Sequence, residues 1–257
     1  MSQSGRYSPP PPQDVIYGQP VASALTDELE RTGAQRVVFV TNTSLTDDID
    51  RIRVGSPVAP ATLRYISIPT TLSAGEYTAI AGVTDERIPR KEALIHPSLA
   101  PDVVILDAAM TVATPPRLYF GTGIRAVDHA VETWCSINVT PLTEASSLHA
   151  LRILPQALAK SKADPDDLDT RLACLIGAWL SIQGVATGVD LGASHGIGHV
   201  LGGTAGMPHG ETSCVMLPHV LRYNNAVNGE RQAILAAAMG DPDTSAADQI
   251  QALVASL

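Results

Sequence analysis

The sequence has few cysteines, no basic cluster and no long apolar run, and each absence excludes a class of protein. The three cysteines are widely spaced, which argues against a disulfide framework and against a cysteine-type zinc site. A net charge of -9 without any Lys/Arg cluster excludes nucleic-acid and anionic-membrane partners. No run of about 18 apolar residues and no charged-then-apolar leader is found, so we expect a cytoplasmic protein that does not span a membrane.

The composition is that of a well-buried protein. Hydrophobic residues make up 45% of the chain and charged residues 17%, which favours a helical or α/β enzyme over a disordered chain. Aromatic residues are scarce, at 4%. Residues 1–14 contain four consecutive prolines, and we interpret them as a flexible tail.

The first half of the chain has an α/β pattern. Val21, Leu25 and Leu29 recur at intervals of four between Pro20 and Gly33, which predicts a short amphipathic helix. Three β-branched apolar runs, at 36–41, 63–68 and 103–106, predict buried strands of a parallel sheet.

The second half has the pattern of a helical domain. Helical periodicity covers residues 118–136, 143–160, 168–186, 212–225 and 245–257. We therefore expect two domains with a boundary near residue 115, an α/β domain over 15–115 and an all-α domain over 116–257.

Three of the seven histidines lie in one segment, G-A-S-H-G-I-G-H-V-L-G-G-T-A-G-M-P-H-G, at residues 192–210. His195 and His199 are four residues apart and share one face if 193–201 is helical, and His209 follows a glycine-rich turn. His129 lies in another helical pattern. Helices that cross can bring such imidazoles together as ligands of a divalent ion, although histidines on apolar helix faces are also common as hydrogen-bonded core residues.

The order of several motifs resembles the iron-containing alcohol dehydrogenase superfamily, including its maleylacetate reductase branch. The motifs are G-I-R-A-V-D-H-A-V-E at 123–132, S-H-G-I-G-H-V-L-G-G-T-A-G-M-P-H-G at 194–210 and L-P-H-V-L-R-Y-N at 217–224. Upstream, I-S-I-P-T-T-L-S-A-G-E-Y-T at 66–78 is similar to the family's loop of paired threonines, with the spacing of maleylacetate reductases. Residues 91–107 are similar to its lysine-to-strand stretch.

The resemblance implies a Rossmann-like N-terminal domain, here truncated, followed by a C-terminal helical domain, with the active site between them. It implies oxidation of an alcohol or reduction of an aldehyde or oxo-acid with NAD(P)H. A divalent ion, Fe or Zn, would bind His129, His195 and His209. His199 matches an additional active-site histidine, and the cofactor contacts match Thr70, Thr71, Ser73, Lys91 and Asn42. Thr71 as a helix cap and Lys91 as a solvated side chain are the alternatives.

Arg125 stands where the family has an aspartate ligand. A guanidinium donates only and repels a cation, so the ion should bind weakly or be absent. Arg125 then binds a substrate carboxylate, or it forms an ordinary salt bridge with Glu132 or Asp128. Asp128 points about 100° away from His129 around the helix, so we expect it to be solvated or to act as a cap.

Two further departures leave the function open. The family's glycine-rich phosphate loop is missing between Asp50 and Thr62, and Asn42 replaces an acidic residue, which makes NADPH as plausible as NADH. The chain also stops at Leu257, earlier than the family pattern, so we expect a shortened, C-terminally incomplete helical domain whose apolar surface is covered in a homodimer. The main hypothesis is an NAD(P)-dependent oxidoreductase. The alternatives are a non-redox descendant that keeps the helical pocket, and an inactive fragment.

Overall fold

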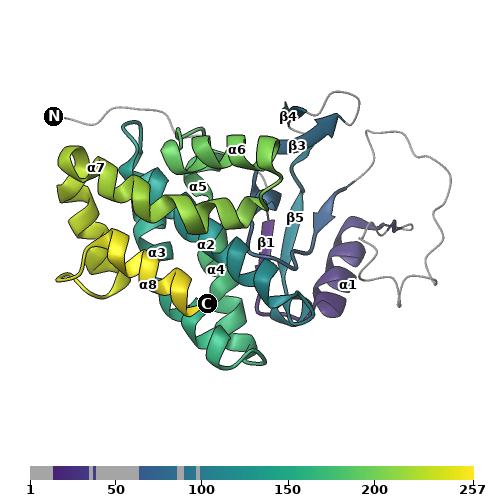
Figure 1. Ribbon diagram of the computed structural model, residues 1–257. Coiled ribbons are helices and arrows are strands. Elements are labelled where there is room, and N and C mark those ends of the chain that lie inside the picture. Colours follow the sequence, from purple (N-terminus) through teal and green to yellow (C-terminus); the bar gives the residue numbers. More distant parts are fainter. Residues whose placement is uncertain (1–13, 35–36, 39–63, 86–89, 97–98) are drawn as a thin grey trace.

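The computed structural model describes residues 14–34, 37–38, 64–85, 90–96 and 99–257. A small parallel sheet with one helix against it lies beside a larger array of helices (Figure 1). This arrangement confirms the predicted fold class, an α/β part followed by an all-α part. Of the predicted flexible tail at 1–14, residues 1–13 lie outside the described residues, and Asp14 is the first residue of a strand instead.

The sheet has β5 (Val103–Leu106) in its centre, with β1 (Asp14–Tyr17) and β2 (Ile66–Ser67) parallel to it on either side. All four residues of β5 are buried, as expected for a strand covered on both faces. Val103 and Ile105 pack with α1 (Val21–Thr32), whereas Val104 and Leu106 join the core of the helical part. The alternation of side chains along β5 therefore connects the two parts.

Helix α1 begins and ends where its flanking residues predict. Pro20 precedes it, and Gly33 closes it with φ 63°, a left-handed conformation that favours glycine. Asp107, directly after β5, accepts a hydrogen bond from the backbone N–H of Val21 at 2.7 Å, which fixes the helix to the end of the central strand.

The remaining strands differ from the prediction. β3 (Ile80–Asp85) and β4 (Arg90–Ile95) form an antiparallel hairpin that the sequence did not reveal. The expected strand at 63–68 is reduced to the two residues of β2. Most of the expected strand at 36–41 lies outside the described residues, and its described members, Val37 and Val38, belong to no strand.

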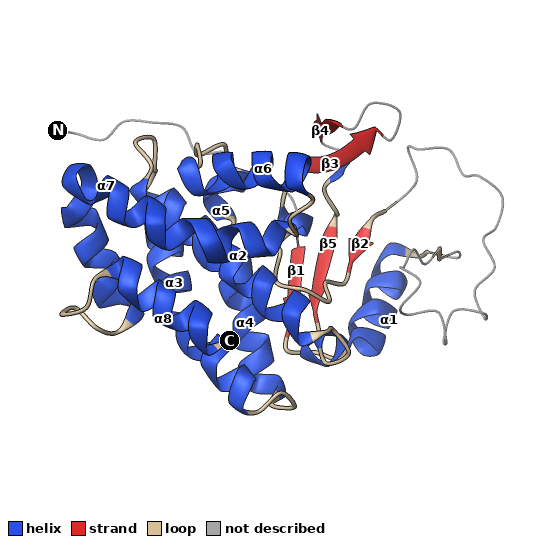
Figure 2. Ribbon diagram, in the orientation of Figure 1, coloured by secondary structure: helices blue, strands red, loops and turns tan. Residues whose placement is uncertain are grey.

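The helical part confirms the predicted helices, with shifted ends (Figure 2). Residues 168–186 form two helices, and the helix expected at 212–225 continues to Met239 with a kink at Asn228. The helices are α2 (Pro116–Cys135), α3 (Pro141–Ala163), α4 (Leu168–Ser181), α5 (Gln183–Ala186), α6 (Ala193–Ala205), α7 (His209–Met239) and α8 (Ala246–Ser256).

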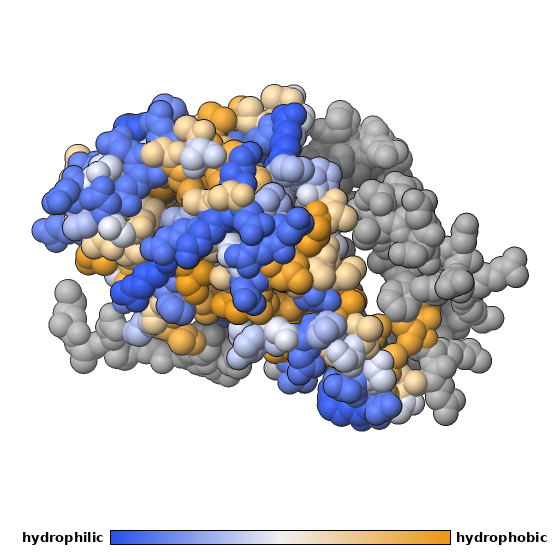
Figure 3. Space-filling model, turned by 90° about the horizontal axis from the view of Figure 1, so that it is seen from below, coloured by the Kyte–Doolittle hydropathy of each residue, from blue (hydrophilic) through white to orange (hydrophobic). Residues whose placement is uncertain are grey.

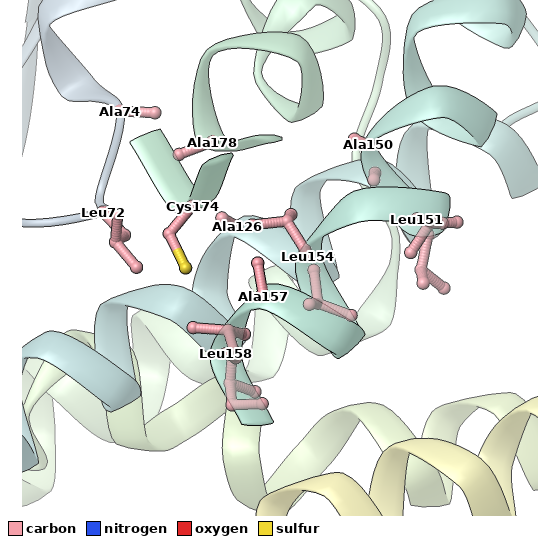
Figure 4. Close-up of a cluster of buried hydrophobic side chains, with 14 of the residues drawn as sticks. Leu72, Ala74, Ala126, Ala150, Leu151, Leu154, Ala157, Leu158, Cys174 and Ala178 are labelled. Atoms are coloured by element: carbon pink, nitrogen blue, oxygen red, sulfur yellow. The ribbon is translucent and has the colours of Figure 1, made fainter. Parts of the chain in front are cut away.

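The core of the helical part is mostly aliphatic and also contains Tyr77, Tyr119, Phe120 and Trp134. Leucines and alanines of α2, α3 and α4 pack with Cys174 and with Leu72 and Ala74 from the loop after β2 (Figure 4). None of the three cysteines forms a disulfide, and burial raises the pKa of the Cys174 thiol to about 11. Among the described residues, no helix is long and apolar enough to cross a membrane.

Candidate active site at the crossing of α2, α6 and α7

Helix α2 lies in the middle of the helical part and carries the polar residues of the candidate site. It packs against α3, α4, α5 and α7, and every residue from 119 to 134 is buried. Arg125, Asp128, His129 and Glu132 are therefore all inside the protein, at 6% exposure or less. Buried polar and charged groups are stable only when neighbouring groups hydrogen-bond to them or neutralise them. These four residues therefore indicate a polar site inside the protein.

Glycines let α6 and α7 approach this part of α2 closely. A Cβ on Gly210 would lie 2.7 Å from the carbonyl carbon of Gly121, and one on Gly198 would lie 2.7 Å from Thr212 Oγ1. A Cβ on Gly192, at the start of α6, would lie 2.8 Å from Glu132 Oε1. Only glycine permits these contacts, because real Cβ atoms do not approach other atoms so closely.

Glu132 and His195 form the shortest polar contact of the site. His195 Nδ1 lies 2.7 Å from Glu132 Oε2, and both side chains are buried. The same carboxylate accepts the backbone N–H groups of Gly192 at 3.0 Å, Ser194 at 2.8 Å and His195 at 3.3 Å. Burial raises the pKa of Glu132, and these backbone donors and Arg125 oppose that shift.

The expectation that Asp128 is solvated or a cap is wrong. Asp128 has no exposed surface, and its Oδ2 accepts a hydrogen bond from Ser194 Oγ at 2.8 Å and lies 3.4 Å from His195 Nδ1. The 100° argument assumed that α2 has a solvent side, whereas α2 is enclosed by other helices. Burial, with the nearby negative charge of Glu132, raises the pKa of Asp128 to about 7.

The imidazoles of His129 and His195 converge from α2 and α6. Their ring centres are 5.0 Å apart and their planes differ by 31°. Two imidazoles bound to one tetrahedral ion through bonds of ~2.0–2.1 Å also have ring centres roughly 5 Å apart, so this pair fits a shared divalent ion. A second possible ligand set is Asp128, Glu132 and His195, which can each offer one ligand atom, all within 4.8 Å of one another.

Arg125 lies one turn before His129, at 3% exposure. Its Nη1 donates a hydrogen bond to Ser213 Oγ of α7 at 3.0 Å. Burial lowers the pKa of Arg125, and the negative charges of Asp128 and Glu132 act against that shift. Since a guanidinium keeps its proton, a positive charge faces the buried carboxylates, and it weakens any cation bound by the imidazoles.

The other two histidines expected at the site, His199 and His209, lie on α6 and α7. His199 is exposed on α6, one turn after His195. His209 is the first residue of α7, one residue before the contact of Gly210 with Gly121, and its side chain lies outside the described part of the structure. At the start of α7, a bidentate ion pair joins Glu211 to Arg117 of α2, with contacts of 2.5 and 2.9 Å.

The expected cofactor residues are only partly described. The loop at 70–73 is attached to the start of α2, because the N–H of Leu72 donates to Thr122 Oγ1 at 3.1 Å. The carbonyl of Thr70 accepts a hydrogen bond from Thr114 at 2.6 Å, and the hydroxyls of Thr71 and Ser73 are 2.6 Å apart. This loop thus reaches α2 one turn before Arg125. Asn42 and the side chain of Lys91, a residue of β4, lie outside the described residues.

Ala74, next in this loop, adopts φ 59° although it is not glycine. Such a conformation costs on the order of 1 kcal/mol and is held here by complete burial of the side chain. A strained, buried residue beside the threonines is typical of loops whose shape serves a ligand.

Sequence reasoning missed the positions of Asp128 and Glu132 and the roles of Ser194 and Ser213. One signal was present: Glu132 follows Arg125 by seven residues and His129 by three, which places all three on one side of a helix.

Comparisons with known proteins identify similar sequences and similar structures. Residues 120–257 match the model of the Fe-containing alcohol dehydrogenase family, C-terminal. The chain is 39% identical over 189 residues to the dehydrogenase ALT3 of Alternaria alternata, covering 68% of this chain and 48% of that protein. It is 33% identical over 214 residues to a maleylacetate reductase of Burkholderia cepacia, covering 83% of this chain and 58% of that one.

A crystal structure of a putative alcohol dehydrogenase from Ralstonia eutropha JMP134 superimposes with a TM-score of 0.87 at 27% identity, over 98% of this chain and 84% of that one. The chain spans about half the length of the curated relatives it matches.

Proposed function

The chain belongs to the Fe-containing alcohol dehydrogenase family, and from this premise we propose that it is an NAD(P)-dependent oxidoreductase that reduces a carbonyl or oxidises an alcohol. The observation that carries the proposal is the convergence of the His129 and His195 rings, 5.0 Å apart, within a buried polar site. The names of the relatives, a dehydrogenase and a maleylacetate reductase, support the reaction class.

His129, His195 and His209 would hold a divalent ion, Fe or Zn. A bound ion of this kind polarises a carbonyl oxygen, and a nicotinamide supplies or accepts the hydride. Arg125 opposes the ion by its charge, so we expect weaker metal affinity than in a site with four ligands. His199, exposed one turn beyond His195, exchanges protons between the site and solvent.

Arg125 indicates the class of substrate. Its guanidinium is buried within the site, at 3% exposure, and donates a hydrogen bond to Ser213 of α7. A planar fork of donors binds a carboxylate in bidentate fashion, so an oxo-acid fits this site better than a simple aldehyde.

For the nicotinamide cofactor we propose Thr70, Thr71, Ser73, Lys91 and Asn42 as contacts, and a site between an α/β domain at 15–115 and a helical domain at 116–257. The attachment of Leu72 to Thr122 supports this arrangement, because it brings the threonine loop to the helix that carries Arg125 and His129.

We further propose a homodimer in the cytoplasm. Val215, Tyr223 and Val227 recur along α7 and are 49%, 87% and 89% exposed. On the face seen in Figure 3, apolar surface also lies among hydrophilic residues. Apolar surface of this kind favours association with a partner.

Calorimetry and turnover assays test the proposed function. The purified chain is titrated with NADH and NADPH, then assayed with a panel of aldehydes and with maleylacetate, with and without Zn²⁺ or Fe²⁺. We expect measurable affinity for one nicotinamide and oxidation of it by an oxo-acid, and we expect His195→Ala to reduce the oxidation. His149→Ala, an exposed histidine change on α3, is the control. Absence of nicotinamide binding and of turnover would favour the non-redox descendant.

A further inference from the structure

One carboxylate, that of Glu132, receives four hydrogen-bond donors from the start of α6. Three are the backbone N–H groups of Gly192, Ser194 and His195, at 3.0, 2.8 and 3.3 Å. The fourth is the ring nitrogen Nδ1 of His195, at 2.7 Å. Helix α6 has no side-chain cap and no acidic residue of its own in its first turn, so a residue of α2 supplies both.

We propose that Glu132 is a positioning residue that fixes the tautomer and the orientation of His195. Both oxygens of Glu132 accept backbone N–H groups, and Oε2, which accepts two of them, also lies 2.7 Å from Nδ1, so Nδ1 carries the proton. In a neutral imidazole Nε2 then carries the lone pair, which is the form that binds a metal ion or accepts a proton. The tautomer of His195 is independent of the proposed function. Only the use of the Nε2 lone pair, to bind a metal ion or to accept a proton, rests on that function.

The capping contacts alone do not explain the arrangement. A cap needs only the backbone N–H groups, whereas Glu132 also makes its shortest contact with the imidazole. Because the same oxygen, Oε2, accepts from Gly192, from the His195 backbone and from the His195 ring, the ring is held at a fixed angle to the first turn of α6. Gly192 is required in this packing, since a Cβ there would lie 2.8 Å from Glu132 Oε1.

The substitution Glu132→Gln keeps the shape but replaces one acceptor by an NH₂ donor. The amide oxygen is favoured at the Oε2 position, where two backbone N–H groups and the ring of His195 converge, so the NH₂ lies at the Oε1 position beside the Ser194 N–H. The variant therefore loses one backbone contact and the negative charge that holds the ring. We expect ¹⁵N NMR of the metal-free protein to show His195 as the Nδ1–H tautomer in the natural chain. The His195 signal is assigned from its loss in His195→Gln.

Zinc affinity gives a second readout. Loss of a carboxylate that orients a histidine ligand lowers metal affinity by about 10–100-fold, so Glu132→Gln should weaken zinc binding by that factor in calorimetry. Glu132→Asp, which retains a carboxylate, should restore part of the affinity. Glu144→Gln, the same change on α3 where Glu144 pairs with Arg231, is the matched control and should leave the affinity unchanged.

The inference is overturned if His195 of the natural chain is the Nε2–H tautomer, a measurement that needs no variant. It is also overturned if Glu132→Gln folds cooperatively and keeps the zinc affinity of the natural chain. An Nδ1–H tautomer in a chain that binds no nicotinamide would instead count against the proposed redox function and leave the assignment of Glu132 intact.

Discussion

Gly210, the second residue of α7, lies against the backbone of Gly121 in α2. A Cβ on Gly210 would stand 2.7 Å from the Gly121 carbonyl carbon and 2.8 Å from its oxygen. This contact sets the crossing of the two helices. Three residues further along α7, Ser213 meets Arg125, which is four residues further along α2. The crossing thus determines which side chains of α7 reach the candidate site.

The substitution Gly210→Ala tests this crossing. Since neither backbone can yield easily, we expect it to destabilise the protein by about 1–3 kcal/mol, the usual range for overpacking, and to weaken zinc binding because His209 is displaced. Urea unfolding and calorimetry measure the two effects. Gly203→Ala in α6 is the control: its new Cβ would meet nothing within 4 Å, so we expect no loss and a gain of up to ~1 kcal/mol. Equal effects of the two variants would show that the contact is unimportant.

Replacement of Arg125 by aspartate should strengthen metal binding. Arg125→Asp exchanges a repelling charge for a fourth ligand one turn before His129, so we expect zinc to bind at least tenfold tighter. Without metal the variant should be less stable than the natural chain, because its new carboxylate would be buried together with those of Asp128 and Glu132. Thermal melting with and without Zn²⁺, with Arg152→Asp on α3 as the control for charge, measures both. Unchanged affinity would place the ion away from Arg125.

Removal of the guanidinium without a new charge tests its role toward substrate. With Arg125→Met, we expect KM for an oxo-acid such as maleylacetate to rise at least tenfold, because a charge-assisted pair with the carboxylate is lost. KM for a neutral aldehyde should change by less than threefold. Steady-state kinetics with both substrates decide the matter, and a parallel rise would mean that Arg125 supports the structure of the site only.

Asp128 predicts a pH dependence of stability. Its pKa in the folded protein, about 7, lies above its value in the unfolded chain. The folded state therefore holds more protons between about pH 4 and pH 7, and stability decreases as the pH rises through this window, by on the order of a few kcal/mol. Asp128→Asn should remove much of this decrease. Urea unfolding at pH 5 and pH 8 with a chelator present measures it, and Asp166→Asn in the exposed α3–α4 loop is the control. Equal slopes for the natural chain and Asp128→Asn would contradict the assignment.

Elements with strong local signals were predictable, and those that depend on pairing were not. Pro20 and Gly33 bounded α1, and the β-branched run of β5 gave that strand in full. β1 has only four residues, and its identity depends on pairing with β5, 86 or more residues away in the chain. The hairpin of β3 and β4 likewise depends on cross-strand contacts, and so has little local signal.

The same distinction holds at the candidate site. Sequence spacing put His195 and His199 on one helix, and the helical pattern around His129 suggested a second helix nearby. Whether their imidazoles meet depends on how α6 crosses α2, and the 5.0 Å between the rings of His129 and His195 is a result of the tertiary structure. The roles of His199 and His209, and of the cofactor contacts, stay predictions.

The sequence by itself determined the α/β and helical parts and the candidate histidines, because these follow from composition and from periodicity along the chain. Only the tertiary structure decided the surroundings of those histidines. Helix α2 is enclosed on all sides, so Asp128, which a helical wheel assigns to solvent, is buried beside Ser194, and Glu132 reaches His195 of another helix. Periodicity states which residues share a face, whereas burial and charge depend on what packs against that face.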